Sequence, residues 1–564
     1  MNVAQLEAEG AFSTLDVELA RALCRLSGAD QPAQWLAVAL ASREVQHGHT
    51  CADLQALAGT PIYDAPDAPR YPDLESWLLA LSPLTGDAGP LVLEGHRLYL
   101  ARYFDHECAL AALVRGLAAK LEPPTSELVR RLFPAPVDKQ RDAALAARAN
   151  RFSVIVGGPG TGKTSTVVKL LALLVDDALQ QGLPPPRTLL VAPTGKAAQR
   201  LTESIERARD SLPVEDAIKR AITSKASTVH RALGPLDDSL TRFRHSPERP
   251  LDCDLLLLDE ASMVDLSLMR RLLSAVPAHA RVIMLGDPDQ LASVEAGGVL
   301  FDLVRAGERV DGALTVSRLT VSYRYPEHSG IAALARAVHA QSVQDALEVL
   351  RAGRDDVFFA ASPKPRELGK PLEREAREHY SALRHGDREA RLGALDHFRV
   401  LCAHRSGPAS VEQLNPLLSR ALGPDRGLNY AGRPIIISQN DYASQLFNGD
   451  VGVLHAHNPR RRELVAAFRA GEAVREVSLA RLPSHESAYA MTVHKSQGSE
   501  FDRVAIVLPE RPSRLLSREL LYTAITRAKH AVSIYASEAS LRAAIMQRSE
   551  RNTGLAERLT RAAP

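Results

Sequence analysis

The sequence feature that most restricts the fold is a glycine-rich segment from Gly157 to Thr164, which reads GGPGTGKT and matches the phosphate-loop pattern G-x-x-x-x-G-K-[ST]. The apolar run Phe152 to Val156 before it predicts a buried strand, and Ser165 to Val175 after it predicts a helix. In this context backbone N–H groups and the helix N-terminus face the phosphates of a nucleotide. The predicted nucleotide-binding residues are Gly157, Gly158, Pro159, Gly160, Thr161, Gly162, Lys163 and Thr164.

Two residues at the end of this segment have distinct predicted roles. Lys163 neutralises phosphate charge, and the hydroxyl of Thr164 ligates Mg²⁺. A glycine-rich turn that contains Gly-Lys-Thr by chance is the alternative. The pattern favours a protein that binds a nucleoside triphosphate with Mg²⁺.

Two carboxylates end another predicted strand. Leu255 to Leu258 is a continuous apolar run, and Asp259 and Glu260 follow it directly. Ligands of α/β sheets bind at this end of the strands, where Asp259 is suited to hold Mg²⁺ and Glu260 to deprotonate an attacking water. We therefore predict that both residues act in nucleotide hydrolysis.

Three further polar side chains are candidates for contact with the γ-phosphate. Gln290 lies in a turn after the apolar run Val282 to Leu285, and its amide would contact ATP but not ADP, so that it senses hydrolysis. Arg324 and Arg527 are candidates because phosphoryl transfer needs positive charge beyond the γ-phosphate, which a separate domain often supplies. A plain turn and surface arginines are the alternatives.

The apolar runs predict two α/β halves, since continuous apolar strands alternating with helices indicate parallel sheets covered on both faces. The first half contains the strands named above and Thr188 to Val191. The second half contains the strands Phe398 to Cys402, Val504 to Leu508 and Ala531 to Tyr535. A strand-rich insertion over residues 424–487 lies between the first two of these.

The first 120 residues contain no recognised chemical motif. Val17 to Leu26 and Ala33 to Ser42 predict helices, and Leu91 to Leu100 predicts a hairpin. Seven acidic and three basic side chains over residues 1–60 give a net charge of −4. This charge suits the docking of a protein partner better than the binding of phosphates, with a solvated helical face as the alternative.

Composition limits the remaining classes. A chain of 564 residues predicts several domains, and a net charge of +2 requires that any nucleic-acid site be a local groove. The five scattered cysteines contain no C-x-x-C pair and favour a reducing compartment without a structural metal. No leader and no apolar run long enough to cross a bilayer is found, so the prediction is a cytoplasmic protein without membrane contact.

The motifs together resemble those of superfamily 1 helicases in order and spacing. The segments that carry the resemblance, in addition to the phosphate loop, are Ala192 to Ala198, Asp259 to Ser262, Gly286 to Leu291, Thr492 to Phe501 and Tyr522 to Lys529. Within that superfamily the details are similar to the RecD-like family, to which the α subunit of the bacterial exodeoxyribonuclease V (RecBCD) complex belongs. The segments similar to that family are Pro90 to Tyr103, Val191 to Leu201, Ser227 to Gly234, His404 to Pro408 and Leu446 to Gly452.

The resemblance implies an α/β fold with two RecA-like parallel-sheet motor domains, a mostly helical N-terminal domain that docks a partner, and a small SH3-like β insertion in the second motor domain. The implied boundaries are 1–120 for the N-terminal domain, 121–330 for the first motor domain, 331–564 for the second, and 424–487 for the insertion. A small pin insertion that splits duplex DNA would fall within 202–250, where the residues show no clear hairpin.

The resemblance also implies an activity, which is ATP-driven movement from 5′ to 3′ along single-stranded DNA. Gln140 would read the adenine edge, with a glutamine on a helix surface as the alternative, and Arg324 and Arg527 would be the two γ-phosphate arginines. The implied DNA contacts are Pro193, Thr194, Lys196, Thr492, His494 and Ser496. His494 as a core residue is the alternative, and Thr228 and His230 stay unassigned between structural and DNA-facing roles.

The leading hypothesis is therefore a DNA helicase subunit that acts with RecB-like and RecC-like partners on double-stranded DNA ends in recombinational repair, with the nuclease site on another subunit. A second hypothesis is a stand-alone RecD-like helicase, but such proteins carry a longer N-terminal region with helix-hairpin-helix repeats. A third is a scaffold that binds ATP without movement, and the presence of Lys163, Glu260 and Arg527 speaks against it.

Overall fold

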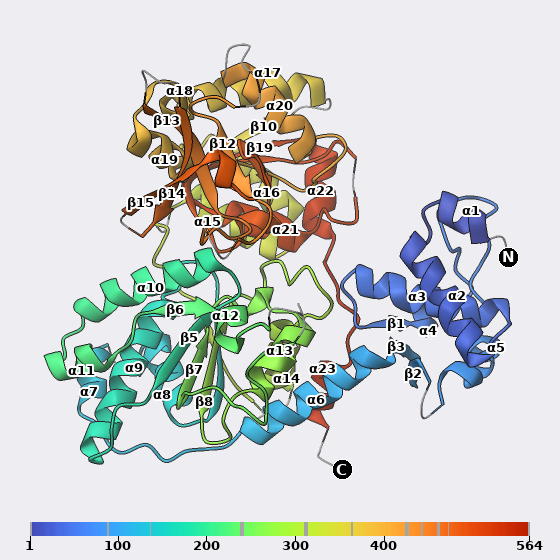
Figure 1. The fold of residues 1–564 in the computed structure, drawn as a ribbon, viewed down its shortest axis with the longest axis horizontal. Helices are drawn as coiled ribbons and strands as arrows, with labels where there is room; N and C mark the ends of the chain where they lie inside the picture. Colours follow the sequence, from blue (N-terminus) through green and yellow to red (C-terminus); the bar gives the residue numbers. More distant parts are fainter. Residues whose placement is uncertain are drawn as a thin grey trace.

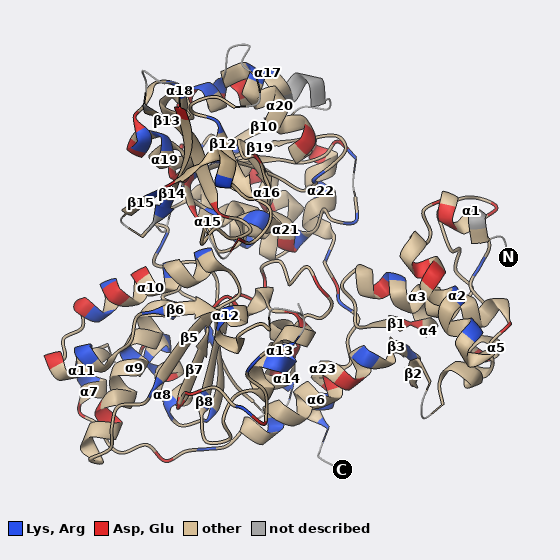
Figure 2. Ribbon diagram, in the orientation of Figure 1, with Lys and Arg blue, Asp and Glu red and all other residues tan. Residues whose placement is uncertain are grey.

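Four β-sheets organise the chain in the computed structural model (Figure 1). The structure describes residues 3–86, 89–135, 137–236, 242–309, 314–326, 328–361, 365–422, 427, 429–441, 444–458, 463–471, 473–511 and 513–561. A small N-terminal domain lies to one side of two larger bodies, each built around a parallel sheet, and these are called here the first and the second sheet domain. Lys, Arg, Asp and Glu are mixed over all three bodies (Figure 2).

The first sheet domain contains a six-stranded parallel sheet in the order β6-β5-β7-β8-β4-β9. Its elements are α6 (Ala101–Leu117), α7 (Leu128–Leu132), α8 (Lys139–Arg148), β4 (Phe152–Gly157), α9 (Lys163–Gln180), β5 (Thr188–Ala192), α10 (Gly195–Asp210), α11 (Asp216–Ala221), β6 (Ala226–Thr228), α12 (Val229–Leu233), β7 (Leu255–Leu258), η2 (Ala261–Met263), α13 (Leu266–Ser274), β8 (Arg281–Gly286), α14 (Val299–Arg309) and β9 (Thr315–Leu319).

Alternation along these strands explains why helices cover both faces. Successive side chains of a strand point to opposite faces, and in β7 Leu256 and Leu258 join one apolar cluster while Leu255 and Leu257 join another. All four leucines are buried. The prediction of parallel strands covered on both faces is confirmed, and it places the carboxyl ends of β4, β7 and β8 at one edge.

The second sheet domain contains a five-stranded parallel sheet in the order β10-β19-β18-β11-β17. Its elements are α15 (Gly330–His339), α16 (Val343–Arg351), β10 (Val357–Ala361), α17 (Pro365–His379), α18 (Ser381–His385), α19 (Arg388–His397), β11 (Phe398–Cys402), α20 (Val411–Leu422), β17 (Ala490–Thr492), η4 (His494–Ser496), β18 (Phe501–Val507), α21 (Arg518–Ile525), β19 (Ala528–Ala536) and α22 (Glu538–Met546). The two sheet domains bear out the predicted pair of RecA-like halves.

An antiparallel sheet interrupts the second sheet domain between α20 and β17, in the order β15-β14-β13-β12-β16. Its elements are β12 (Pro434–Ile437), β13 (Val451–Asn458), β14 (Glu463–Ala470), β15 (Ala473–Ser478), η3 (Leu479–Arg481) and β16 (His485–Ser487). It has an apolar cluster of its own around Ile435, Leu454 and Phe468. The strands lie within the range expected for the insertion, of which residues 424–426, 428, 442, 443, 459–462 and 472 lie outside the described residues; its SH3-like character stays a prediction.

The N-terminal domain combines helices with a three-stranded antiparallel sheet in the order β1-β3-β2. Its elements are α1 (Val3–Ala8), α2 (Thr14–Ser27), α3 (Pro32–Gln46), β1 (Cys51–Asp53), α4 (Leu54–Leu57), α5 (Leu74–Ala80), η1 (Ser82–Leu84), β2 (Leu91–Glu94) and β3 (Arg97–Leu100). Ser13 and Asp16 form a capping box that begins α2, and Gly28, with a left-handed φ of 65°, ends it. The hairpin predicted at Leu91 to Leu100 is present as β2 and β3.

The chain does not end in the second sheet domain. After α22 it crosses back, and the last helix, α23 (Leu555–Thr560), packs between α6 and α14 beside the N-terminal domain (Figure 1). Leu555 and Leu559 of α23 belong to an apolar cluster of the first sheet domain. The segment 547–561 therefore touches all the bodies that it connects.

A paired excursion follows α12 within the range predicted for a pin. The amide of Leu236 donates to the carbonyl of Arg242, and the amide of Arg244 donates to that of Gly234. The backbone is therefore paired antiparallel, as in a hairpin, although no hairpin was evident in the sequence. Its tip, residues 237–241, lies outside the described residues.

Candidate functional site

The phosphate loop connects β4 to α9 at the carboxyl edge of the first sheet. Gly160 and Gly162 have left-handed φ values of 75° and 82°, which few residues other than glycine adopt. A side chain at Gly160 would overlap the Cβ of Arg324. Lys163 begins α9, and its ammonium donates to the carbonyls of Gly157 at 2.5 Å and Gly158 at 3.2 Å. The backbone of the loop thus holds the Lys163 ammonium at the N-terminus of α9, a helix of 18 residues.

Asp259 and Glu260 extend from the end of β7 beside this loop. The amide of Asp259 donates to the carbonyl of Val191 at 2.9 Å, which continues the strand pairing. Glu260 has a left-handed φ of 52°, an uncommon backbone conformation for glutamate, and its amide donates to the Asp259 carboxylate at 2.9 Å. Burial, together with the Glu260 charge, raises the pKa of Asp259 to about 6, while Lys163 opposes the shift. Two negative charges are held close together where a cation would stabilise both.

Gln290 lies after β8 and is fixed by two charged neighbours. Its amide nitrogen donates to Asp287 at 2.9 Å, and its amide oxygen accepts from Arg527 at 2.5 Å. Asp287 and Gln290 are both buried, and burial raises the pKa of Asp287. The hydroxyl of Tyr522 also donates to Asp287, at 3.4 Å. Side chains from both sheet domains thus meet at Gln290, because Tyr522 and Arg527 belong to the second.

The two candidate arginines approach the phosphate loop from different directions. Arg527 follows α21, and besides Gln290 it donates to the carbonyls of Thr523 at 3.2 Å and Ser499 at 3.1 Å. Arg324 follows β9, donates to the carbonyl of Thr526 at 3.3 Å, and forms an ion pair with Glu500. Burial lowers the pKa of Arg527, which shows how poorly its charge is solvated.

Glu500 joins the two sheet domains at this point. Besides Arg324 it contacts Arg200 of α10 at 2.6 Å, and Arg200 also donates to the carbonyl of Gly498 at 2.9 Å. The two arginines hold the pKa of Glu500 down, to about 2, against the effect of its burial. Glu500 and Asp287 were not predicted as site residues, although each lies in a segment that carries the helicase resemblance.

Gln140, the second residue of α8, contacts the phosphate loop through its side chain. Its amide nitrogen donates to the carbonyl of Thr161 at 3.3 Å, and a side chain at Gly162 would overlap it. Tyr323 also lies at the loop, where its amide donates to the carbonyl of Gly160 at 2.8 Å and its ring is 68% exposed. An exposed aromatic ring beside a phosphate loop offers a stacking surface, which the sequence analysis missed.

The candidate DNA-contacting residues lie where the two sheet domains approach each other. Thr194 caps α10 by accepting from the amide of Ala197, and Pro193 before it is half-buried. The Lys196 ammonium lies 5.7 Å from the centre of the Phe501 ring, and burial lowers its pKa to about 8. Across the gap, a Cβ on Gly498 would lie 3.6 Å from the Thr194 hydroxyl.

The candidate DNA-contacting residues of the second sheet domain differ in burial, since Thr492 and His494 are half-buried and Ser496 is buried. Thr492 accepts from the amide of Lys495 at 3.3 Å, and His494 is half-buried, with a pKa lowered by burial and by Arg551. Ser496 is fully buried and donates to the carbonyl of Val493 at 2.7 Å. In this conformation Thr492 and Ser496 hold the turn that carries them.

The two unassigned residues, Thr228 and His230, have structural contacts. Thr228 caps α12 by accepting from the amide of Arg231 at 3.1 Å. The ring of His230 lies 5.9 Å from that of Phe243, and burial lowers its pKa. These contacts favour a structural role for both.

Family models match three segments of the chain. Residues 140–296 match an AAA domain, residues 487–535 match a UvrD-like helicase C-terminal domain, and residues 8–99 match the N-terminal domain of the RecBCD enzyme subunit RecD. The first match contains the phosphate loop, Asp259, Glu260 and Gln290, and indicates nucleotide binding. None of the helices among the described residues is long and apolar enough to span a membrane.

Full-length relatives extend the similarity. The chain is 42% identical to the RecBCD enzyme subunit RecD of Mycolicibacterium smegmatis, over 96% of this chain and 97% of that protein. It is 33% identical to the ATP-dependent RecD2 DNA helicase of Deinococcus radiodurans, over 85% of this chain and 60% of that protein. A crystal structure of Bacteroides Pif1 bound to single-stranded DNA covers 72% of this chain, and the chain covers 94% of it, with a TM-score of 0.40 and 17% identity.

Proposed function

The chain belongs to the family of the RecBCD enzyme subunit RecD, and from this premise we propose that it is an ATP-driven motor that moves from 5′ to 3′ along single-stranded DNA as the helicase subunit of a RecBCD-type helicase–nuclease. The observation that carries the proposal is the contact between Arg527 of the second sheet domain and Gln290 beside the phosphate loop of the first. A nucleotide bound there contacts both sheet domains at once.

ATP binding is assigned to the loop and its two flanks. Backbone N–H groups of the loop and the Lys163 ammonium would hold the phosphates, and Lys163 would exchange its two carbonyl partners for phosphate oxygens. Gln140 and Tyr323 lie on either side of the loop, where an amide and an aromatic ring suit the adenine base. Thr164 and Asp259 would hold Mg²⁺, which supplies positive charge to the phosphates when bound.

Hydrolysis is assigned to residues that gather around the expected γ-phosphate. Glu260 would deprotonate the attacking water, because it has a carboxylate at the strand end beside the loop. Arg527 and Arg324 would stabilise the charge that develops on the phosphoryl oxygens, which is the largest contribution to catalysis in this class of reaction. Gln290 would exchange its bond to Arg527 for one to the γ-phosphate and so report its presence.

Movement along DNA follows from the same contacts. We assign the DNA contacts to Pro193, Thr194 and Lys196 of one sheet domain and to Thr492, His494 and Ser496 of the other, and the nucleotide would lie between the same two domains. With each ATP the two sheet domains would close and open. The DNA contacts of one domain would then shift along the DNA strand relative to those of the other. Contacts to phosphates and stacking on bases provide a grip without reading sequence.

Partners and setting follow from the family. The assembly named by the relatives is RecBCD, so RecB-like and RecC-like subunits are the proposed partners, double-stranded DNA ends the proposed substrate, the nuclease site lies on another subunit, and the cytoplasm is the proposed location. The proposed domains are 1–120, 121–330 and 331–564, with the C-terminal segment packed on the first two, the SH3-like insertion at 424–487 and the pin within the paired excursion after α12.

A stand-alone helicase is the second candidate function. It is favoured by the 33% identity to the RecD2 helicase, but the chain spans only 60% of that protein and 97% of the mycobacterial RecD subunit. Strand displacement by the purified chain without partners would favour the stand-alone enzyme.

The proposed activity is tested by ATP hydrolysis with and without single-stranded DNA. The wild-type chain is expected to hydrolyse ATP faster when the DNA is added, and Lys163→Gln to abolish this activity. Lys169→Gln is a matched control, because Lys169 lies on the same helix but its ammonium is 4.6 Å from the centre of the Phe133 ring, away from the loop. Equal rates for wild type and Lys163→Gln would remove the basis of the site assignment, and hydrolysis that single-stranded DNA does not change would indicate the scaffold.

A further inference from the structure

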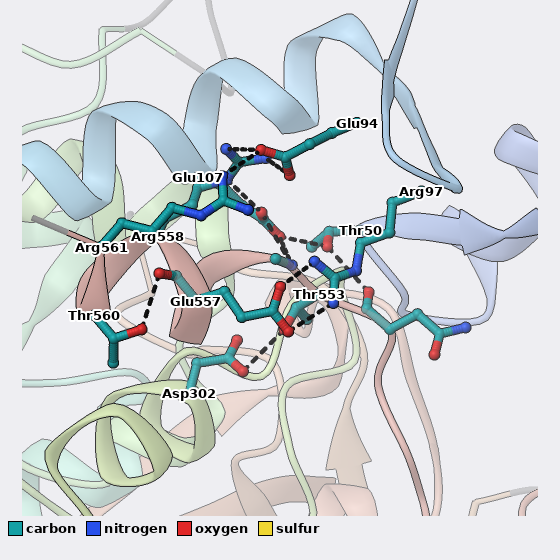
Figure 3. A network of polar contacts seen from close by, with 12 residues as sticks. Thr50, Glu94, Arg97, Glu107, Asp302, Thr553, Glu557, Arg558, Thr560 and Arg561 are labelled. Carbon is teal, nitrogen blue, oxygen red and sulfur yellow. Dashed lines mark hydrogen bonds and ion pairs between the residues drawn. The ribbon is translucent and has the colours of Figure 1, made fainter. Parts of the chain in front are cut away.

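The C-terminal segment forms a polar network where the N-terminal domain meets the first sheet domain, a region called here the N-terminal joint (Figure 3). It leaves α22 of the second sheet domain, passes the N-terminal domain, and ends as α23 between α6 and α14. Along this path its side chains and backbone bond to residues that precede them by more than 400 positions. The C-terminal segment thus completes a contact region whose other residues lie near the start of the chain.

The N-terminal domain has its own apolar core. The cluster that contains Leu36, Leu40 and Trp77 draws its described members from Leu6 to Leu98 alone. Leu555 and Leu559 of the C-terminal segment belong instead to the cluster of the first sheet domain. Among the described residues, no cluster of buried apolar side chains spans the N-terminal domain and the first sheet domain. Besides the contact between the Tyr99 and Phe104 rings at 5.4 Å, polar contacts therefore form most of the joint.

A buried carboxylate stands at the centre of that joint. Glu107 of α6 is fully buried and accepts from the Arg558 guanidinium at 3.2 Å, from the Thr50 hydroxyl at 2.6 Å and from the Gly554 amide at 3.1 Å. Arg558 also donates to both oxygens of Glu94, at 2.8 and 3.0 Å. One arginine of the C-terminal segment thus satisfies two carboxylates, one on β2 and one on α6.

A second ion pair and a backbone pairing support the first. Arg97 of β3 donates to both oxygens of Glu557, with 2.7 Å for one of the two contacts. The amide of Thr50 donates to the carbonyl of Asn552 at 2.9 Å, and the amide of Asn552 donates to the ring of His49 at 2.9 Å. The segment is therefore bound through its backbone as an extended peptide is, with side chains that add charge complementarity.

The same segment reaches the loop that follows Gln290. Arg551 donates to the carbonyls of Ser293 at 2.6 Å, Glu295 at 3.1 Å and Gly48 at 2.5 Å. The amide of Gly297 donates directly to the carbonyl of Gly48 at 2.9 Å. A side chain at Gly48, where φ is 89°, would overlap Arg551, so the close approach requires glycine. The joint thus continues to within a few residues of the proposed γ-phosphate sensor.

We propose that the N-terminal domain and the adjoining helix α6 form a binding surface, centred on Glu94 and Arg97 of the domain and Glu107 of α6, whose ligand is this chain's own C-terminal segment, residues 547–561. The segment acts as a clasp that holds the N-terminal domain on the first sheet domain. The two bodies then move as one when the cleft opens and closes. This role is separate from nucleotide hydrolysis and does not depend on it.

The test is hydrogen exchange of the full-length chain without nucleotide or DNA, so that its outcome is independent of the proposed activity. Two amides report the joint: Thr50, bonded to Asn552, and Gly297, bonded to Gly48. Arg97→Glu is expected to speed the exchange of both amides by roughly tenfold. This factor corresponds to the free energy with which two contacting residues typically stabilise each other. The combined variant Arg97→Glu with Glu557→Arg is expected to restore slow exchange, which a misfolded variant would not do.

Arg70→Glu is the matched control, since Arg70 is an exposed arginine of the same domain whose guanidinium donates to the carbonyl of Gly59, within that domain. It is expected to leave exchange at Thr50 and Gly297 unchanged. Wild-type exchange in Arg97→Glu, or exchange in the combined variant as fast as in Arg97→Glu alone, would overturn the proposal.

Discussion

Two buried arginines show how the cleft and the clasp differ. Arg558 of the clasp is 8% exposed and bonds to two carboxylates, Glu94 and Glu107. Arg527 of the cleft is 3% exposed and donates to neutral acceptors, namely the Gln290 amide and the carbonyls of Ser499 and Thr523. Both junctions join bodies that have apolar cores of their own. In the clasp the arginine bonds directly to carboxylates, whereas Glu260 and Glu500 in the cleft only oppose the lowering of the pKa of Arg527 by burial.

This difference distinguishes a contact region that stays closed from one that changes when a ligand binds. Burying a charge without a counter-charge is costly, so such a site persists where an ion completes it. The cleft gathers Lys163 and Arg527 around a space suited to phosphates, while the clasp balances its charges internally. The cleft is therefore expected to change with its ligand and the clasp to remain closed.

The largest effect is expected at the cleft arginine. Arg527→Ala should lower the rate of ATP hydrolysis at saturating ATP by roughly 10³–10⁵-fold, the contribution of an arginine that stabilises phosphoryl transfer. Lys529→Ala is the control, because Lys529 lies two residues further on, half exposed, and pairs with Asp502 at 3.7 Å. Steady-state hydrolysis measures both, and a loss of less than tenfold in Arg527→Ala would place Arg527 with the structural arginines.

The clasp arginine should affect stability instead. Arg558→Met leaves Glu107 buried beside an apolar group and should destabilise the N-terminal joint by about 3–5 kcal/mol, because a buried ion pair has lost one partner. Urea denaturation followed by tryptophan fluorescence measures this, since both tryptophans of the chain, Trp35 and Trp77, lie in the N-terminal domain.

Arg561→Met is the matched control for Arg558→Met. Arg561 also contacts Glu94, at 3.0 Å, but its side chain is 61% exposed, so the loss should be below about 1 kcal/mol. Arg558→Met and Arg561→Met each remove one positive charge beside Glu94, but only Arg558 is buried. The difference between their losses of stability therefore measures the effect of burial. Equal losses would contradict the view of the clasp as a buried, internally balanced network.

A pH effect is expected where the clasp meets α14. Asp302 is buried and accepts from the Thr553 hydroxyl at 2.9 Å, and burial raises its pKa to about 8; Glu107 and Glu557 act in the same sense and Arg305 against it. The folded chain thus binds a proton that the unfolded chain releases near pH 3.8, so stability falls as the pH rises from there toward 8. Asp302→Asn should remove this decline, which thermal denaturation at pH 5 and pH 8 measures; an unchanged pH dependence would contradict it.

The smallest effect is expected at the DNA-facing lysine. Lys196→Ala should weaken binding of single-stranded DNA and reduce the slope of log affinity against log salt by about 1, as expected for the loss of one phosphate contact. Lys219→Ala is the control, because Lys219 is half-buried on α11 and donates to the carbonyl of Asp210, within the first sheet domain. Fluorescence anisotropy at several salt concentrations measures both. Equal slopes for the two variants would exclude Lys196 from the DNA path.

The sequence predicted those parts of the molecule that local pattern determines. The phosphate loop, the buried strands such as Leu255–Leu258 and the hairpin at Leu91–Leu100 have short-range signals, and the structure contains them. The edge strands β6, β9 and β10 were missed. β6 (AST) and β9 (TVSRL) are only partly buried and lack a continuous apolar run, whereas β10 (VFFAA) is apolar but also only partly buried. These edge strands are recognised only in the folded sheets, because they pair with central strands that the sequence did predict.

The clasp could not be predicted, because nothing near Arg558 in the sequence indicates a partner 451 residues earlier. The same holds for the pairing of Glu500 with Arg200 and Arg324, which depends on how the two sheet domains approach each other. Local motifs identified the residues that bind a nucleotide, whereas the contacts that position those residues required the folded chain.

The central claim, a motor that moves from 5′ to 3′, is tested most directly by strand displacement on two duplexes that differ only in the polarity of their single-stranded tail. The chain, alone and with its RecB-like and RecC-like partners, is mixed with ATP and each duplex, and Lys163→Gln serves as the inactive control within the same assembly. Displacement that requires the 5′ tail and is lost in Lys163→Gln is the predicted result. Displacement from the 3′ tail that is lost in Lys163→Gln would contradict the assigned direction.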